Sequence, residues 1–180
     1  MNIISTALPD VKLLEPQVFG DARGFFLESY NRRKLNALGI ECEFVQDNHS
    51  RSEYNVLRGL HYQIRQPQGK LVRAIVGEIL DVAVDMRRSS PTFGKAVSFQ
   101  LSAANKLMAW IPAGFAHGFL VRSACAEVLY KATDYYAPEY ERSLLWNDPA
   151  LRIEWGLGEA PLLSSKDRLG VLLNNAEVFD

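Results

Sequence analysis

The chain has 180 residues, of which 48% are hydrophobic and 23% are charged, and its net charge is −1. This balance predicts one folded domain, residues 1–180, with a substantial core, and it excludes a protein that coats nucleic acid through a global basic field. A local basic pocket for a small anionic ligand stays open. The N-terminus shows no secretory signal pattern, and the longest apolar stretch, residues 107–121, is shorter than a membrane span. Cys42 and Cys125 suggest neither a disulfide framework nor a metal pair, so we expect a reduced, cytoplasmic setting.

Short strands separated by turn residues dominate the predicted structure. One helix is expected at residues 32–38, with Asn31 as its N-cap and Gly39 at its end, and a second short helix follows Ser164. Turns such as QPQG and SSPTFG, together with the lack of long helical crossovers, favour an all-β, antiparallel jelly-roll barrel with a few short helices. The expected strands are rich in β-branched, aromatic and aliphatic residues and cover residues 25–30, 42–48, 56–64, 70–77, 78–87, 95–101, 107–111, 117–123 and 126–133.

The stretch NVLRGLHYQ, residues 55–63, places two polar side chains in an otherwise apolar strand. Strict alternation would put Arg58 and His61 on opposite faces of the sheet. Gly59 lies between them, and a glycine inside a strand often marks a bulge that redirects side chains. We therefore expect a local bulge that lets Arg58 and His61 reach one ligand, although a core histidine is the commoner interpretation of His61 taken alone.

Several other polar residues have plain structural interpretations. Lys70 begins an apolar strand and would extend its ammonium to water. Asp81 and Asp85 share a face with Ala83, and we expect them to point to solvent or to cap barrel edges rather than to do acid–base chemistry.

Two further residues also admit a structural role. Tyr130 fits a core aromatic residue whose hydroxyl is satisfied. Asp167 fits a capping box with Ser164 at the start of the second helix.

The stretch IPAGFAHGF, residues 111–119, bears on metal binding. Its Pro-x-Gly-x-x-His pattern is similar to the second motif of cupin β-barrels, in which the histidine is a metal ligand. This chain has three histidines, His49, His61 and His117, and no His-x-His pair. Their spacing gives no support to a metal site, so we expect no metal and favour histidines that serve acid–base chemistry.

Six motifs taken together point to one family. VFGDARGFFLESYN, FVQDNHSRS, VLRGLHYQ, QGKLVRAIVGEILDVAVDMRRSSPTFG, WIPAGFAHGFLV and LSSKDR, spread between residues 9 and 168, closely resemble the dTDP-4-dehydrorhamnose 3,5-epimerases. These are metal-free cupins of the dTDP-L-rhamnose pathway. The resemblance implies conversion of dTDP-4-dehydro-6-deoxy-D-glucose to dTDP-4-dehydro-L-rhamnose by inversion at C3 and C5. It implies no cofactor, because the C4 ketone already acidifies both neighbouring C–H bonds.

The resemblance also implies a division of roles in catalysis. It makes His61 the base, with Asp167 as a carboxylate that fixes the imidazole tautomer and stabilises the imidazolium. It places Lys70 near the C4 oxygen, where an ammonium would stabilise the enolate. It makes Tyr130 the acid that returns a proton from the opposite face.

Substrate binding is implied at a larger set of positions. Arg58 resembles a diphosphate ligand, and Tyr136 resembles the aromatic residue that stacks on thymine. The family usually forms homodimers that exchange N-terminal segments, which would place Arg23 and Glu28 at the partner's site. The full set is Arg23, Glu28, Gln46, Asp47, Asn48, Arg58, Lys70, His117, Tyr136, Glu141 and Lys166.

Three alternatives stay open at this point. The chain could invert only C3 or only C5 of a related dTDP-4-keto-deoxysugar, although Tyr130 and the full RGLHYQ motif favour both. It could be a sugar-nucleotide-binding barrel without activity, which the presence of every implied catalytic group disfavours. It could be a metal-dependent cupin oxygenase or isomerase, which the missing His-x-His pair disfavours.

Overall fold

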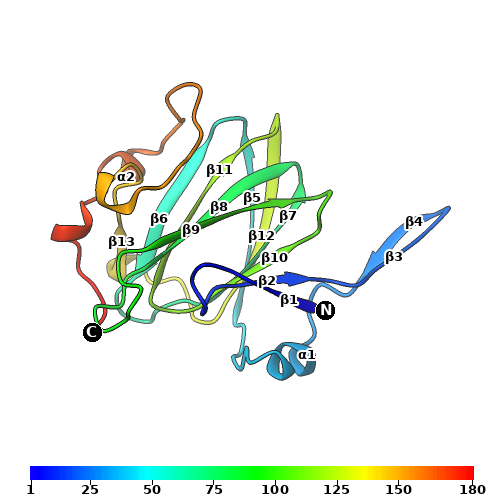
Figure 1. Ribbon diagram of the computed structural model, residues 1–180. Coiled ribbons are helices and arrows are strands. Elements are labelled where there is room, and N and C mark those ends of the chain that lie inside the picture. The colour runs from blue at the N-terminus through cyan, green and yellow to red at the C-terminus, as the bar shows by residue number, and fades with distance from the viewer.

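Two antiparallel sheets pack against each other in the computed structural model, which describes residues 1–180 (Figure 1). The larger sheet has six strands in the order β1 (Asn2–Ser5), β2 (Lys12–Glu15), β10 (Met108–Ile111), β7 (Lys70–Val76), β12 (Cys125–Ala132) and β5 (Gln46–Glu53). The smaller sheet has five strands in the order β13 (Glu141–Ser143), β6 (Leu57–Gln63), β11 (Phe115–Val121), β8 (Glu78–Asp85) and β9 (Ala96–Ser102). The predicted antiparallel jelly roll is therefore confirmed.

Short helices and one hairpin complete the fold. The hairpin is formed by β3 (Val18–Asp21) and β4 (Gly24–Leu27), which pair with each other and with no other strand. No helix is long and apolar enough to cross a membrane. The helices are α1 (Arg32–Ala37) and α2 (Ser165–Arg168), with single 3-10 turns at η1 (Pro138–Tyr140), η2 (Pro149–Leu151) and η3 (Leu173–Asn175).

The main core lies between the two sheets. Val72 and Val128 project into it from the six-stranded sheet, and Ile79, Ala83 and Phe119 meet them from the five-stranded sheet. These side chains are almost fully removed from water. Burying this apolar surface is the main force that holds the sheets face to face.

A second core covers the outer face of the five-stranded sheet. Leu60, Val82 and Leu120 pack there against Leu151 and Trp155 of the long segment that follows β13. Because both faces of this sheet are covered, β11 is buried along its whole length. Strands in such a position are apolar on both faces, so their sequences lack the alternation that would show which side chains face inward.

The helix ends follow the predicted signals. The Asn31 side chain accepts a hydrogen bond from the Lys34 amide at 3.3 Å and so caps α1. Gly39 adopts a φ of +72° just beyond the last turn, a conformation that favours glycine at a helix end. Ser164 likewise caps α2.

The main errors in the strand prediction lie in the first part of the chain and at β13. The strand expected at residues 42–48 begins only at Gln46, because Cys42 and Phe44 pack against the cluster beside α1 instead. Four strands were not predicted: β1, β2, β3 and β13. Each has only three or four residues, so neither length nor composition marks it.

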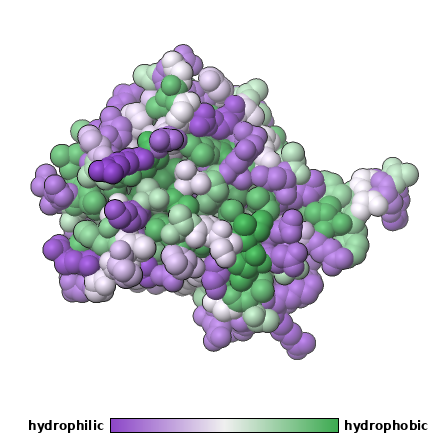
Figure 2. Space-filling model, in the orientation of Figure 1, coloured by the Kyte–Doolittle hydropathy of each residue, from purple (hydrophilic) through white to green (hydrophobic).

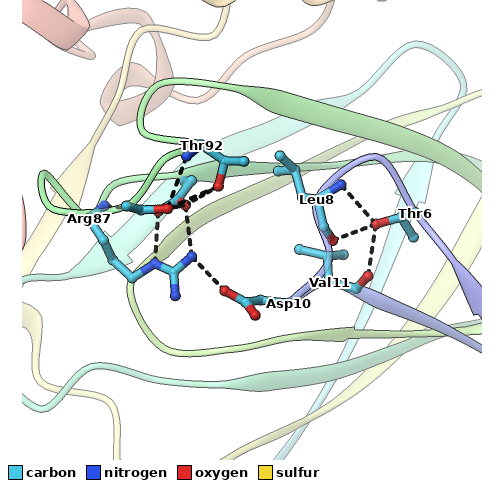
Figure 3. Close-up of polar contacts among 8 residues, drawn as sticks. Thr6, Leu8, Asp10, Val11, Arg87 and Thr92 are labelled. Carbon is cyan, nitrogen blue, oxygen red and sulfur yellow. Dashed lines mark hydrogen bonds and ion pairs between the residues drawn. The ribbon is translucent and has the colours of Figure 1, made fainter.

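The N-terminal segment is fastened to the end of β8 by a polar network (Figure 3). Arg87 bonds both Asp85, at 2.7 Å, and Asp10, at 2.8 Å. Asp85 is completely buried and also accepts hydrogen bonds from Ser90 and Thr92. Burial alone would raise the pKa of Asp85, but these hydrogen bonds hold it well below its ordinary value. Asp85 thus caps an edge of the barrel, as expected, but does not point to solvent.

The β3–β4 hairpin extends away from both sheets (Figures 1 and 2). It carries Phe19, Phe25 and Phe26, whose exposed fractions are 54%, 62% and 69%. Three exposed phenylalanines on one arm form an apolar surface of a kind that commonly marks an interaction site.

Candidate active site

A cleft of about 780 Å³ lies between the two sheets. Its walls come from β5, β7 and β12 on one side, from β6, β11 and β13 on the other, and from the segment around α2. This volume is typical of a site for a small molecule. Eleven of the predicted site residues line it: Gln46, Asn48, Arg58, His61, Lys70, His117, Tyr130, Tyr136, Glu141, Lys166 and Asp167.

A bulge in β6 brings Arg58 and His61 to the same cleft. His61 is paired with His117 on β11, and Arg58 is paired with Phe119, so two residues of β6 lie opposite one residue of β11 between these pairs. Gly59 lies in the bulge with a φ of +130°, and a Cβ there would come within 2.5 Å of the Gly118 backbone. The predicted bulge is confirmed, and Gly59 is required for both its conformation and this close approach.

His61 forms a pair with the buried carboxylate of Asp167. The His61 Nε2 atom lies 2.5 Å from Asp167 Oδ1. Burial alone would raise the pKa of Asp167, but hydrogen bonds from His61, Ser164 and the Gly59 amide hold it below its ordinary value. An ionised carboxylate on Nε2 favours the tautomer with a proton on that nitrogen, which leaves the Nδ1 lone pair free to act as a base. The expected capping box forms only in part, because Ser164 caps the Asp167 amide while the Asp167 side chain turns to His61.

Lys70 presents an unpaired ammonium at the first position of β7. The residue is 9% exposed, and its ammonium makes no hydrogen bond or ion pair within the protein. Burial lowers the pKa of Lys70 to about 8, while the carboxylates of Glu141 and Asp81 act in the opposite direction. The residue does not extend to water, in contrast to the expectation from its place at a strand end. A buried cation without a partner is well suited to bind negative charge.

Tyr130 lies across the cleft from His61. Its strand, β12, belongs to the six-stranded sheet, whereas His61 lies on the five-stranded sheet. The Tyr130 hydroxyl has no hydrogen-bond partner within the protein, unlike a satisfied core tyrosine. Burial raises its pKa, so the phenol keeps its proton at neutral pH and can act as an acid.

A second histidine–aspartate pair stands beside the first. His117 Nε2 lies 2.9 Å from Asp81 Oδ2, and Asp81 is completely buried. The expectation that Asp81 points to solvent or caps an edge is wrong. The face that it shares with Ala83 looks into the space between the sheets, and the opposite face is covered by the C-terminal segment. Asp81 is therefore a site-supporting residue that sequence reasoning missed, although its shared face with a small core alanine was a usable signal.

Three side chains are linked at the mouth of the cleft. Lys166 donates to Glu141 at 2.7 Å, and the Tyr136 hydroxyl donates to the same carboxylate at 3.1 Å. Burial alone would raise the pKa of Glu141, but the hydrogen bond and charge of Lys166 hold it below its ordinary value. The Tyr136 amide is in turn bound by the Gln46 side chain at 2.9 Å. This linkage orients the exposed ring of Tyr136 at the entrance.

Three predicted binding residues lie outside the cleft of this chain. Arg23 sits on the β3–β4 hairpin, where it pairs with Asp21. Glu28 pairs with Lys34 close to α1. Asp47 points to the opposite face of its sheet from Gln46 and Asn48, as strand alternation requires, and pairs with Lys131.

Together these groups make a site for acid–base chemistry. It contains an oriented imidazole on one wall, a tyrosine hydroxyl on the other, and a buried ammonium between facing sheets. Nowhere do three histidine, cysteine, aspartate or glutamate side chains cluster closely enough to hold a metal ion. Fold and site thus define a jelly-roll enzyme that moves protons on an anionic substrate.

Comparison with known proteins identifies the particular family. The family model for dTDP-4-dehydrorhamnose 3,5-epimerase matches residues 5–175. The dTDP-4-dehydrorhamnose 3,5-epimerase of Pseudomonas aeruginosa is 63% identical over 99% of both chains, and that of Salmonella typhimurium is 58% identical over 98% of this chain and 97% of its own. The crystal structure of dTDP-6-deoxy-D-glucose-3,5-epimerase from Legionella pneumophila in complex with dTDP-4-keto-L-rhamnose has a TM-score of 0.96. It is 54% identical and covers 98% of this chain and 94% of that one.

The chain belongs to the dTDP-4-dehydrorhamnose 3,5-epimerase family. The family, the jelly-roll fold and the epimerase function predicted from the motifs are confirmed.

Proposed function

We propose that this protein inverts C3 and C5 of dTDP-4-dehydro-6-deoxy-D-glucose to give dTDP-4-dehydro-L-rhamnose, with His61 as base and Tyr130 as acid. The observation that carries the proposal is their placement on facing sheets across one cleft. Inversion requires that a proton leave one face of a carbon and that another arrive on the opposite face. Two groups on facing walls meet this requirement, whereas a single base would return the proton to the face it came from.

Each inversion proceeds in two proton transfers. His61 Nδ1 removes the proton from C3 or C5, and the C–H electron pair moves into a C–C double bond as the C4 carbonyl becomes an enolate. The ammonium of Lys70 stabilises the negative oxygen. Tyr130 then protonates the same carbon from the other face, and the carbonyl re-forms. His61 returns its proton to water and the Tyr130 phenolate takes one from water, so no electrons are gained or lost overall.

Asp167 acts through His61 by holding its tautomer and stabilising the imidazolium. The remaining cleft residues would bind the nucleotide. Arg58 has no carboxylate partner, and its guanidinium is held by Ser52 and the Arg51 carbonyl, so it is free to bind the diphosphate. The exposed ring of Tyr136 is placed to stack on the thymine.

The test is incubation of the protein with dTDP-4-dehydro-6-deoxy-D-glucose in D₂O, followed by NMR of the sugar protons. Deuterium at both C3 and C5, with the L-configured product trapped by a reductase, is the expected result. Label at one carbon alone would make the protein a single-site epimerase. No label with retained dTDP binding would overturn the enzymatic assignment in favour of a binding barrel.

We also propose that the working form is a homodimer in which the β3–β4 hairpins are exchanged. Arg23 and Glu28 lie outside the cleft of their own chain, and the hairpin carries three exposed phenylalanines. In the partner's cleft the hairpin would bury this apolar surface and bring Arg23 to an anionic ligand.

A mixing experiment tests the exchange. Arg23→Ala and His61→Asn proteins, each weakly active or inactive alone, should regain activity when mixed and allowed to exchange subunits, because some sites then combine an intact hairpin with an intact base. A monomer by light scattering, or a mixture no more active than its parts, would contradict the proposal.

We further propose a cytoplasmic location, in keeping with the free thiols of Cys42 and Cys125. Cell fractionation with an antibody to the protein should recover it in the cytoplasmic fraction, and recovery from another compartment would overturn this.

A further inference from the structure

Residues 163–170, which we call the strap, run beside β6 and β13 and line one side of the cleft. The strap is fastened at both ends by β-bridges, between Leu162 and Val56 before it and between Val171 and Leu144 after it. Among its own residues only Asp167 is buried. The carboxylate that orients His61 therefore comes from a thin, largely exposed segment rather than from either sheet, and its position must be fixed by specific contacts.

Ser164 binds the oxygen of the Asp167 carboxylate that His61 does not contact. Its hydroxyl donates to Asp167 Oδ2 at 2.6 Å and accepts from the Asp167 amide at 3.2 Å. The other carboxylate oxygen, Oδ1, takes the His61 ring nitrogen at 2.5 Å and the Gly59 amide at 3.4 Å. Both oxygens of the buried carboxylate are thus engaged, and Ser164, Asp167 and His61 form one continuous chain of hydrogen bonds.

We propose that Ser164 is a positioning residue for catalysis, whose hydroxyl holds the Asp167 carboxylate in the orientation that presents His61 to the substrate. The inference rests on the proposed function and adds a third member to its histidine–aspartate pair. Without the Ser164 hydroxyl, Oδ2 loses its only hydrogen-bond donor in a buried place, and the carboxylate is free to rotate away from His61.

Helix capping alone does not account for this geometry. An N-cap needs only an acceptor for a backbone amide of the first turn, and in a capping box the acidic side chain reaches back to the backbone of the cap residue. Here the Asp167 side chain turns to the Ser164 hydroxyl and to His61 instead. The hydroxyl hydrogen is directed at the carboxylate, which capping does not require.

Two substitutions separate positioning from capping. Ser164→Gly keeps most of the capping preference but removes the hydroxyl, and Ser164→Thr keeps both functions. We expect kcat to fall about tenfold in Ser164→Gly, as for loss of a hydrogen bond to a charged group, with KM and the Kd for dTDP nearly unchanged. Ser164→Thr should stay within about twofold of the wild-type kcat. The matched control is Ser165→Gly, which places the same change one position along on an exposed residue without side-chain hydrogen bonds and should leave kcat unchanged.

A spectroscopic readout complements the kinetics. The short His61–Asp167 hydrogen bond should give a strongly downfield imidazole N–H resonance, assigned by its absence in His61→Asn. We expect Ser164→Gly to shift or broaden this resonance and Ser164→Thr to retain it.

The outcomes are distinct from those of the proposed function. If the wild-type protein exchanges no C–H hydrogen in D₂O, the function itself fails. A second outcome is that the wild type exchanges C–H hydrogen while Ser164→Gly and Ser165→Gly show the same kcat and the same imidazole resonance. In that case only the proposed role of Ser164 fails. Loss of kcat in both Ser164→Gly and Ser164→Thr would also overturn it, because the retained hydroxyl would then have no effect.

Discussion

Two histidine–aspartate pairs face the same cleft from neighbouring strands, and they differ in where the carboxylate comes from. His61 and His117 are cross-strand partners on β6 and β11. Asp167 reaches His61 from the strap, and 24% of the His61 side chain is exposed. Asp81 reaches His117 from the adjacent strand β8, and 9% of the His117 side chain is exposed.

The two carboxylates also differ in how many of their oxygens accept a hydrogen bond. Every oxygen of Asp167 has a donor, whereas Asp81 Oδ1 is buried without one. The first pair is more open to the cleft and fully engaged, as suits a base that gains and loses a proton in every inversion. The second pair is fixed inside the sheet close to Lys70, whose pKa it influences. Under the proposed function, the same motif moves protons at His61 and places a negative charge near Lys70 at Asp81.

Replacing the two histidines should give the largest contrast. His61→Asn removes the base, so we expect exchange at both C3 and C5 to fall by about 1,000-fold or more. His117→Asn should lower kcat/KM by about tenfold, because it removes a contact rather than the proton acceptor. Hydrogen exchange in D₂O measures both, and a His61→Asn protein with wild-type exchange would refute the base assignment.

Replacing the two aspartates should give the next contrast. Asp167→Asn offers His61 Nε2 an amide in place of a carboxylate and can stabilise the wrong tautomer, so kcat should fall about 100-fold or more. Asp81→Asn should lower kcat by less than about tenfold. Steady-state kinetics with thermal melting as a folding control tests this, and equal losses in the two variants would remove the distinction between the pairs.

The pH dependence tests the link between the second pair and Lys70. Since burial lowers the pKa of Lys70 to about 8, its ammonium is charged at neutral pH and loses its proton as the pH rises. We expect kcat/KM to fall as the pH rises through about 8. Asp81→Asn removes a negative charge that favours the ammonium, so the fall should move to lower pH. An alkaline limb at the same pH in both proteins would argue against coupling.

The smallest expected effect concerns the strap. Lys166→Met breaks the ion pair with Glu141, in which the lysine side chain is 47% exposed, and pairs this exposed stabilise a protein only weakly. We expect kcat to fall about threefold to fivefold, because the strap then holds the neighbouring Asp167 less firmly against His61. Lys95→Met, at an exposed lysine without an ion pair, is the control and should leave kcat unchanged. A rise in KM alone would show that Lys166 binds substrate without affecting the strap.

The central strands of the fold could be predicted because their apolar runs are long. Strands β6 to β12 follow the predicted ranges closely, whereas β13, with the sequence ERS, is a strand only because it pairs with β6. Local composition carries no sign of such a pairing. The same limit applies to the hairpin β3–β4, which pairs only with itself.

The site could be predicted mainly through its motifs. His61, Lys70, Tyr130 and Asp167 were named from motif resemblance and all line one cleft. Strand parity alone would have separated Arg58 from His61, since only Gly59 hinted at the bulge. The role proposed for Ser164 could not be predicted, because it depends on the contact of the Asp167 side chain with His61, which lies 106 residues away in the sequence.

The most direct test of the account is the reaction of Tyr130→Phe with dTDP-4-dehydro-6-deoxy-D-glucose in D₂O, analysed by NMR. If His61 removes protons from one face and Tyr130 returns them to the other, the variant should still exchange deuterium into C3 and C5 of recovered substrate with retained configuration. The L-configured product should be almost absent. Equal loss of exchange and inversion would contradict the opposite-face arrangement and leave Tyr130 a structural role.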